Sequence, residues 1–140
     1  MKLAAHQPGA LETRLREIRT TGRKILVPYI TGGLTGWIDA IRGAAANGAD
    51  AIEIGIPFSD PVMDGPIIQM ASEKALRDGA TPTSILHELR SVDVDVPLIV
   101  MCYYNTVFRA GHARFANALR EAGVVAAIVP DLPLEESPIW

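Results

Sequence analysis

The group with the clearest chemical potential in this sequence is the carboxylate of Glu53, which lies inside an apolar run. Side chains on a strand alternate between its two faces, so Ile52, Ile54 and Ile56 would share one face. Glu53 would then share the opposite face with Gly55, whose missing side chain leaves room for a ligand. Burying a carboxylate in such a strand is costly unless it is paired, protonated or chemically active. Glu53 is therefore a candidate functional residue, with a buried ion pair as its main structural alternative.

A second carboxylate, Asp64, follows on the loop that leaves the same strand after Pro57. In parallel α/β proteins, active sites form at the carboxyl ends of the strands, where this loop would lie. A structural role is an equal alternative, because Asp64 precedes a Gly-Pro pair and could cap the next helix. Asp60 precedes a proline and could likewise belong only to a turn. Neither a cap nor a turn explains Glu53 in mid-strand.

The composition sets limits on the class of protein. The 140 residues are 49% hydrophobic and carry a formal net charge of −3, which suits one domain or part of a larger one. Charges of both signs are interspersed, so nucleic acid is not an expected partner. The single cysteine, Cys102, excludes an internal disulfide and is expected to be a buried, inert thiol. The apolar run near the start is broken at His6 and Pro8, so we expect no signal peptide, and no apolar run reaches the ~20 residues of a membrane span. We expect a cytoplasmic protein without a metal site.

Strands and helices alternate along the chain. Apolar runs predict strands over Ile25–Ile30, Ala51–Ile56, Pro97–Tyr103 and Val124–Val129. Helices are predicted over Ala10–Thr20, Gly36–Asn47, Ile67–Arg77, a segment that begins at Thr81 and Pro82, and His112–Ala122, with residues 1–9 as a loose terminus. This alternation favours a parallel sheet covered by helices. Gly48 and Gly123 each end a helix shortly before a strand, a repeat that suggests successive βα units of a barrel.

Several motifs in this order resemble the α subunit of tryptophan synthase. They are EIGIPFSDP at residues 53–61 with DGP at 64–66, VPYIT at 27–31, MCYYN at 101–105 and VPDLPLEE at 129–136. The sequence departs from the family at TGGLT, residues 31–35, where the family's aspartate is missing. The resemblance implies a (β/α)8 TIM barrel with an extra N-terminal helix. Residues 1–140 would form its N-terminal half, about the first four βα units.

The family's reaction would be retro-aldol cleavage of indole-3-glycerol phosphate to indole and glyceraldehyde 3-phosphate. The resemblance makes Glu53 and Asp64 the catalytic pair. Protonation of indole C3 needs a neutral acid near pH 7, which burial of Glu53 would favour. An ionised Asp64 on the wetter loop would accept a hydrogen bond from the indole N–H as that group becomes more positive. Tyr29 and Tyr103 match positions in the family's substrate pocket, and Thr31 beside them is a further expected substrate-binding residue. A role as core aromatics is the alternative for the two tyrosines.

The resemblance also implies a partner, the tryptophan synthase β subunit, in an α2β2 complex. Pro57, Asp60 and Asp131 match positions at or near that interface. No cofactor is expected in this chain, and pyridoxal phosphate is expected in the β subunit. Two alternatives stay open: a catalytically inactive half-barrel that docks on a β subunit, and another phosphate-sugar barrel such as an epimerase. The epimerase alternative does not explain the pairing of Glu53 with Asp64 and lacks the metal-ligating histidines that some such enzymes use.

Overall fold

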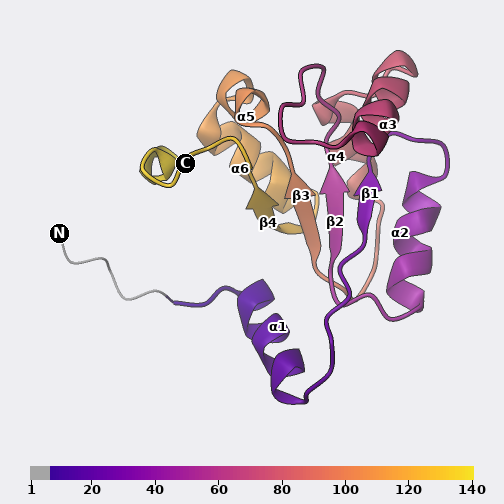
Figure 1. Ribbon diagram of the computed structural model, residues 1–140, viewed down its shortest axis with the longest axis vertical. Helices are drawn as coiled ribbons and strands as arrows, with labels where there is room; N and C mark the ends of the chain where they lie inside the picture. The colour runs from indigo at the N-terminus through magenta and orange to yellow at the C-terminus, as the bar shows by residue number, and fades with distance from the viewer. Residues whose placement is uncertain (1–6) are drawn as a thin grey trace.

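Four parallel strands form one sheet, and each strand lies beside the next one in the sequence, in the order β1-β2-β3-β4. The computed structural model describes residues 7–140 (Figure 1). Its strands are β1 (Tyr29–Thr31), β2 (Ile52–Gly55), β3 (Leu98–Met101) and β4 (Val124–Ile128). Its helices are α1 (Ala10–Thr20), α2 (Trp37–Ala46), α3 (Pro66–Arg77), α4 (Pro82–Leu89), α5 (Tyr104–Ala110) and α6 (His112–Glu121), followed by the 3₁₀ turn η1 (Ser137–Ile139). The predicted α/β class with a parallel sheet is confirmed.

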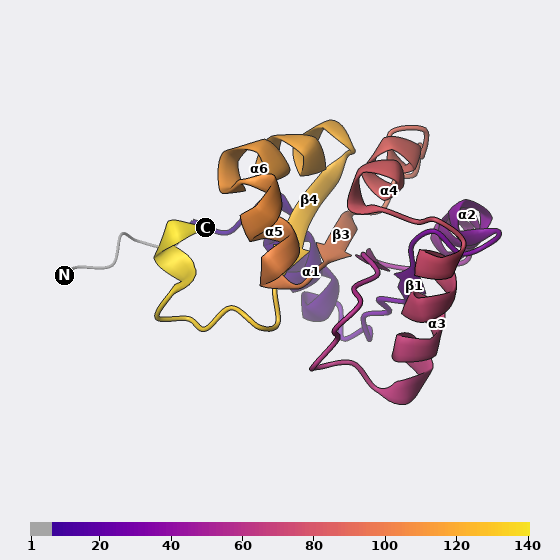
Figure 2. The ribbon, with the colours of Figure 1, turned by 90° about the horizontal axis from the view of Figure 1, so that it is seen from above.

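The hydrophobic core lies between one face of the sheet and three helices. Ile52, Ile54 and Ile56 all belong to it, which confirms that they share a face. The helices contribute apolar side chains from their inner faces: Trp37 and Ile41 from α2, Ile85, Leu86 and Leu89 from α4, and Phe115 and Leu119 from α6. Figure 2 shows α2, α4 and α6 along the same side of the strands.

The opposite face of the sheet carries the candidate site. In register across the strands, Tyr29 of β1 pairs with Glu53 of β2, and Glu53 pairs with Ile99 of β3. Residues paired in this way project from the same face of a sheet. Thr31 and Gly55 form the neighbouring row nearer the carboxyl ends of the strands. These side chains therefore point away from the core that the three helices cover.

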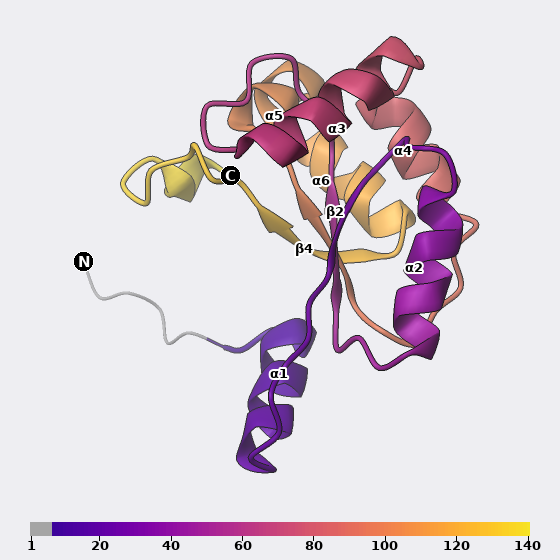
Figure 3. The same ribbon diagram turned by 45° about the vertical axis from the view of Figure 1, so that its right-hand side comes forward.

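Helix α1 lies apart from the other helices, at the amino ends of the strands (Figure 3). Its Arg14 donates from Nε to the backbone oxygen of Asp50, at 3.3 Å. The Asp50 carboxylate in turn forms an ion pair with Arg23 and accepts the Leu26 N–H at 2.8 Å. Asp50, buried just before β2, thus fastens α1 and the segment that leads into β1 to the bottom of the sheet.

The two largest differences from the prediction are the first strand and helix α5, whereas the ends of the other elements agree within one or two residues. The first strand, predicted over Ile25–Ile30, is only Tyr29–Thr31, because Pro28 has no N–H to donate and the preceding residues pair irregularly. Helix α5 was absent from the prediction altogether. Other expectations are confirmed: Thr81 caps α4, and Gly48 and Gly123 adopt positive φ after helices. Of the predicted loose terminus, residues 1–6 lie outside the described residues, and residues 7–9 precede α1 without regular structure.

Candidate active site

The predicted catalytic and pocket residues come together at the carboxyl ends of β1, β2 and β3. Tyr29 lies beside Glu53 in the register of β1 with β2. Asp64 lies on the loop between β2 and α3, and the hydroxyl of Tyr103, which follows β3, reaches this loop. Asp64 and Glu53 both raise the pKa of Tyr29 electrostatically, and Asp64 does the same for Tyr103, so the four groups are near neighbours.

The environment of Glu53 favours the protonated, neutral form of its carboxyl. Its side chain is half-buried on β2, and burial raises the pKa of its carboxyl above the ordinary value. No lysine, arginine or histidine among residues 7–140 forms an ion pair with it. The described part of the chain therefore gives no support to the buried ion pair that was the structural alternative. The raised pKa agrees with the sequence-based expectation.

The space beside Glu53 is filled differently from the prediction. The Tyr29 ring lies over Gly55, where a Cβ would overlap the phenolic oxygen and the adjoining ring carbons. The room that Gly55 leaves is therefore used by a side chain of the same protein and not held open for a ligand. Burial raises the pKa of Tyr29 to about 12, and the Thr31 hydroxyl acts in the opposite direction. Thr31 itself is buried, next to this ring.

Tyr103 connects β3 to the loop between β2 and α3, residues 56–65, which carries Asp60 and Asp64 and is called the acidic loop below. Its ring is buried and its hydroxyl accepts a hydrogen bond from the Met63 N–H at 2.9 Å. The Phe58 ring stacks on it, with centroids 5.1 Å apart and planes inclined by 22°. Burial raises the pKa of Tyr103, so the hydroxyl stays protonated. Phe58 and Met63, which sequence reasoning missed, therefore help to fix the loop that ends at Asp64.

Asp64 does not cap the helix that follows it. Helix α3 begins at Pro66 with Gly65 as its N-cap, and no side chain caps its first turn. The backbone oxygen of Asp64 accepts a hydrogen bond from Gln69 Nε2 at 2.8 Å, which ties the end of the loop to α3. The capping alternative for Asp64 is therefore wrong, and its half-buried side chain interacts with Tyr103 instead.

The three candidate interface residues, Pro57, Asp60 and Asp131, lie in different environments. Asp60 is exposed on the loop, and its carboxylate accepts a hydrogen bond from Ser59 Oγ at 2.6 Å. Pro57 is buried at the end of β2, so its part in any contact would be to position the loop. Asp131 is exposed after β4, and its carboxylate accepts the Tyr104 N–H at 2.8 Å, at the start of α5.

Metal binding, membrane crossing and cysteine reactivity have little support among the described residues. Across residues 7–140 there is no group of three or more His, Cys, Asp or Glu side chains that could hold a metal ion. Within the same residues no helix combines the length and apolar character needed to cross a membrane. Cys102 is fully buried, and burial raises the pKa of its thiol to about 12, as expected of an inert cysteine.

Comparisons of the sequence with known proteins agree with one another. The family model described as tryptophan synthase alpha chain matches residues 15–139. The tryptophan synthase alpha chain of Streptomyces coelicolor is 40% identical over 135 residues, covering 93% of this chain and 50% of that protein. The corresponding chain of Azoarcus sp. is 44% identical over 132 residues, covering 90% and 49%. The chain spans about half the length of the curated relatives that it matches.

Solved structures give the same result for the fold. Tryptophan synthase subunit alpha from Legionella pneumophila matches with a TM-score of 0.86 at 34% identity, over 94% of this chain and 52% of that one. A tryptophan synthase structure from M. tuberculosis matches with a TM-score of 0.88 at 33% identity, over 96% and 55%. The matched chains are TIM barrels, so the four parallel strands here correspond to about half of such a barrel, as predicted.

Proposed function

Because the chain belongs to the tryptophan synthase alpha chain family, we propose that Glu53 and Asp64 serve the cleavage of indole-3-glycerol phosphate to indole and glyceraldehyde 3-phosphate. The observation that carries the proposal is the setting of Glu53. It is a half-buried carboxyl with a raised pKa and no ion-pair partner among residues 7–140, and it lies beside Tyr29 and below the Asp64 loop. Such perturbed carboxyls are typical of catalytic sites.

Glu53 would act as the general acid. Its neutral form donates a proton to indole C3, which weakens the bond between that carbon and the glycerol phosphate chain. When the bond breaks, its electron pair returns to the indole ring, and the adjacent hydroxyl becomes the aldehyde as it gives its proton to a base. The Glu53 carboxylate left by the first proton transfer would be that base, which restores the acid. General acid catalysis by a positioned carboxyl contributes about 10²–10⁴-fold in rate. The raised pKa of Glu53 supports this role because it increases the protonated fraction near neutral pH.

Asp64 would stabilise the positive charge that develops at the indole nitrogen. Its carboxylate is free of helix capping and lies on a loop that Tyr103 and Phe58 hold in place. A fixed carboxylate near the indole N–H favours the protonated ring more than the substrate, which is the condition for catalysis. Tyr29, Thr31 and Tyr103 would bound the indole pocket, where aromatic rings suit a flat substrate.

The partner proposed for this family is the tryptophan synthase β subunit, in a cytoplasmic α2β2 complex in which the β subunit carries pyridoxal phosphate. Asp60 would contact the partner directly, because it is exposed on the loop between Glu53 and Asp64. Pro57 and Asp131 would act by holding the neighbouring segments: Pro57 from its buried position and Asp131 through the start of α5.

A second function is favoured by one observation. Strands β1 and β4 are the edges of the sheet in the described residues, so the face that carries Glu53 has no opposite wall. A half-barrel in this state would be catalytically inactive and would at most dock on a β subunit through the loop at Asp60. A closed (β/α) barrel has eight strands, twice the four that residues 7–140 form.

An assay with indole-3-glycerol phosphate tests both functions. Residues 1–140 are compared with a protein in which this segment is continued to the full length of its relatives, each with and without a β subunit. The lyase proposal predicts indole release from the full-length protein, lost by about 10²–10⁴-fold on Glu53→Gln and less on Asp64→Asn, because an amide oxygen still accepts a hydrogen bond. Wild-type turnover in the Glu53→Gln protein would reject the mechanism. Activity of residues 1–140 alone would reject the inactive half-barrel.

A further inference from the structure

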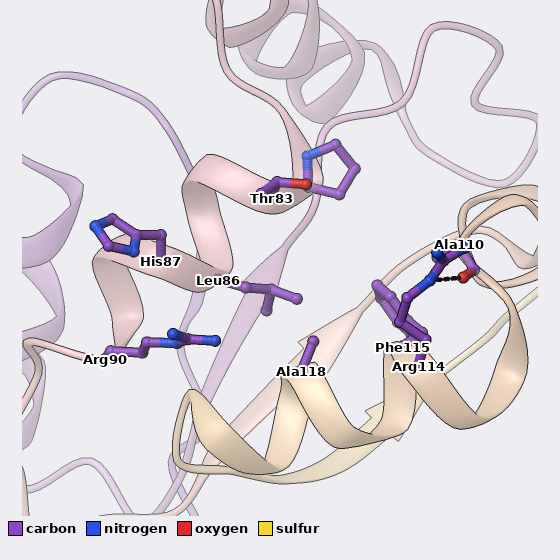
Figure 4. A pocket seen from close by; sticks show the side chains of 9 residues that line it. Thr83, Leu86, His87, Arg90, Ala110, Arg114, Phe115 and Ala118 are labelled. Carbon is purple, nitrogen blue, oxygen red and sulfur yellow. Dashed lines mark hydrogen bonds between the residues drawn. The ribbon is translucent and has the colours of Figure 1, made fainter.

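A groove of about 300 Å³ lies between α4 and α6, on the outer helical layer of the fold (Figure 4). It is built only from the described residues of α4, α6 and the end of α5. The core cluster separates it from Glu53, which projects from the opposite face of the sheet. The groove is therefore a separate feature from the candidate active site.

The floor of the groove is apolar because small side chains face large ones across it. Leu86 of α4 and Phe115 of α6 are buried at the base, with exposed fractions of 5% and 3%. Ala118 faces Leu86 across the gap (Figure 4), and Ala110 closes the end next to Arg114. Alanines at these positions cannot fill the space between the two helices, which leaves an opening at the lower end of the size range of small-molecule pockets, about 300–1,000 Å³.

The rim of the groove is basic. Arg90 and His87 line it from α4 and Arg114 lines it from α6, whereas no aspartate or glutamate is among the lining residues. Arg90 pairs with Glu121 at 2.6 Å, so its charge is largely compensated. Arg114 donates from Nε to the backbone oxygen of Ala110, and its terminal guanidinium nitrogens bind no other group among residues 7–140. One uncompensated cation therefore stands over an apolar floor in a chain whose net charge is −3.

We propose that this groove is a binding site for a small aromatic carboxylate. The flat apolar body would lie on Leu86, Phe115 and Ala118, and the single negative charge would meet the free guanidinium edge of Arg114. A planar guanidinium with two donors on one edge matches a carboxylate in a bidentate arrangement. The backbone bond to Ala110 holds Arg114 in place before the ligand arrives, which reduces the entropy lost on binding.

Titration with 2-naphthoate of the full-length protein in which residues 1–140 are continued to the length of their relatives, followed through backbone amide NMR shifts, tests the proposal. The amide 2-naphthamide serves as the uncharged probe of the same shape. Saturable shifts are expected at Leu86, Phe115 and Ala118. Arg114→Gln and the amide probe should each weaken binding by about tenfold, the loss of a charge-assisted contact. Ala118→Leu should abolish binding by filling the groove. Arg19→Gln, an exposed arginine of α1, should leave the affinity unchanged.

Three results would overturn the proposal. One is an absence of saturable shifts in the wild-type chain. Another is shifts confined to residues around Glu53, which would mean that the probe binds the candidate active site. The third is equal affinity in the wild type, Arg114→Gln and Ala118→Leu chains when all three give the same dispersed spectrum, since a folded variant with a filled or uncharged groove must bind less.

Discussion

The phenolic oxygen of Tyr29 rests directly over the Cα of Gly55, where any added methyl group would overlap it. The two residues are diagonal neighbours on adjacent strands, because Tyr29 pairs with Glu53 and Thr31 pairs with Gly55. Glycine at 55 therefore lets an aromatic ring cross β2 beside the candidate acid. The contact couples the geometry of the pocket wall to a residue that bears no functional group.

Gly55→Ala is expected to destabilise the fold through this contact. The new methyl group must displace the Tyr29 ring, and overpacking of this kind costs about 1–3 kcal/mol in the free energy of unfolding. In a Tyr29→Ala background the same substitution should cost less than half as much, because the clashing ring is absent. Urea denaturation of the four proteins in this double-mutant cycle measures the coupling.

Gly43→Ala provides the matched control for that cycle. Gly43 lies inside helix α2, and nothing stands within 4 Å of the position of its Cβ. Alanine there should stabilise the chain by about 0.5–1 kcal/mol, the usual helix preference. A cost at Gly55 that is the same with and without the Tyr29 ring would show that the ring is not its cause.

The sequence predicted Glu53 well because strand alternation is a local signal. Its position opposite the core, its half-burial and the raised pKa of its carboxyl all follow from the pattern of Ile52, Ile54 and Ile56. The Tyr29 ring over Gly55 could not be inferred in this way. It depends on how two strands are staggered, which no pattern within either strand specifies.

Helix α5 shows the same limit for the fold. Its N-cap, Tyr103, makes no side-chain capping bond, so the usual signal for a helix start is missing. The Tyr104 N–H is bound instead by Asp131, which is 27 residues further along the chain. The bond between Tyr103 and Met63 spans 40 residues in the same manner. Contacts between residues that are this far apart in the sequence hold the site together, and no local sequence pattern predicts them.

Glu53→Gln should change how stability depends on pH, with or without lyase activity. Burial raises the pKa of Glu53, so the folded state holds this proton more tightly than the unfolded state does. Its contribution to stability is full below the unfolded pKa, about 4.3, and is lost as the pH rises through the folded value. The free energy of unfolding of the wild type, relative to that of Glu53→Gln, should therefore be highest near pH 4 and should decrease toward pH 8. Urea midpoints of both proteins at these pH values give the comparison, and a difference that grows in favour of the wild type at pH 8 would contradict it.

Asp50→Asn should show the opposite pH dependence. The Arg23 guanidinium, helped by the Leu26 N–H, holds the pKa of Asp50 below its usual range. This carboxylate stabilises the fold fully above its unfolded pKa of about 3.9, and the contribution is lost as the pH falls through the folded value. The wild type should thus be clearly more stable than Asp50→Asn at pH 7, and the gap should narrow by pH 2.

The control for Asp50 is an exposed carboxylate of the same type. Asp39 of α2 pairs with Arg42 at 3.2 Å, but its side chain is 84% exposed and the pair is screened by water. Asp39→Asn should therefore leave the urea midpoint nearly unchanged at both pH values. If the two asparagine variants behaved alike, the buried network at the bottom of the sheet would not be the source of the effect.

The open edges of the sheet should make residues 1–140 associate with one another. Among residues 7–140, strands β1 and β4 each have a neighbouring strand on one side only, and unpaired backbone groups at such edges recruit further strands. Apolar side chains add to this at β4, where Val125 is 53% exposed and Ile128 is 41% exposed. Sedimentation at micromolar concentration should detect species larger than the monomer. Ile128→Lys should shift them toward the monomer because a charged edge strand resists pairing.

Val62→Lys is the control for this variant. It adds the same charge at a 77% exposed position on the acidic loop, away from either edge, and should leave association unchanged. A wild-type chain that sediments as a monomer and melts sharply would mean that these edges are far less adhesive than their unpaired backbone groups imply.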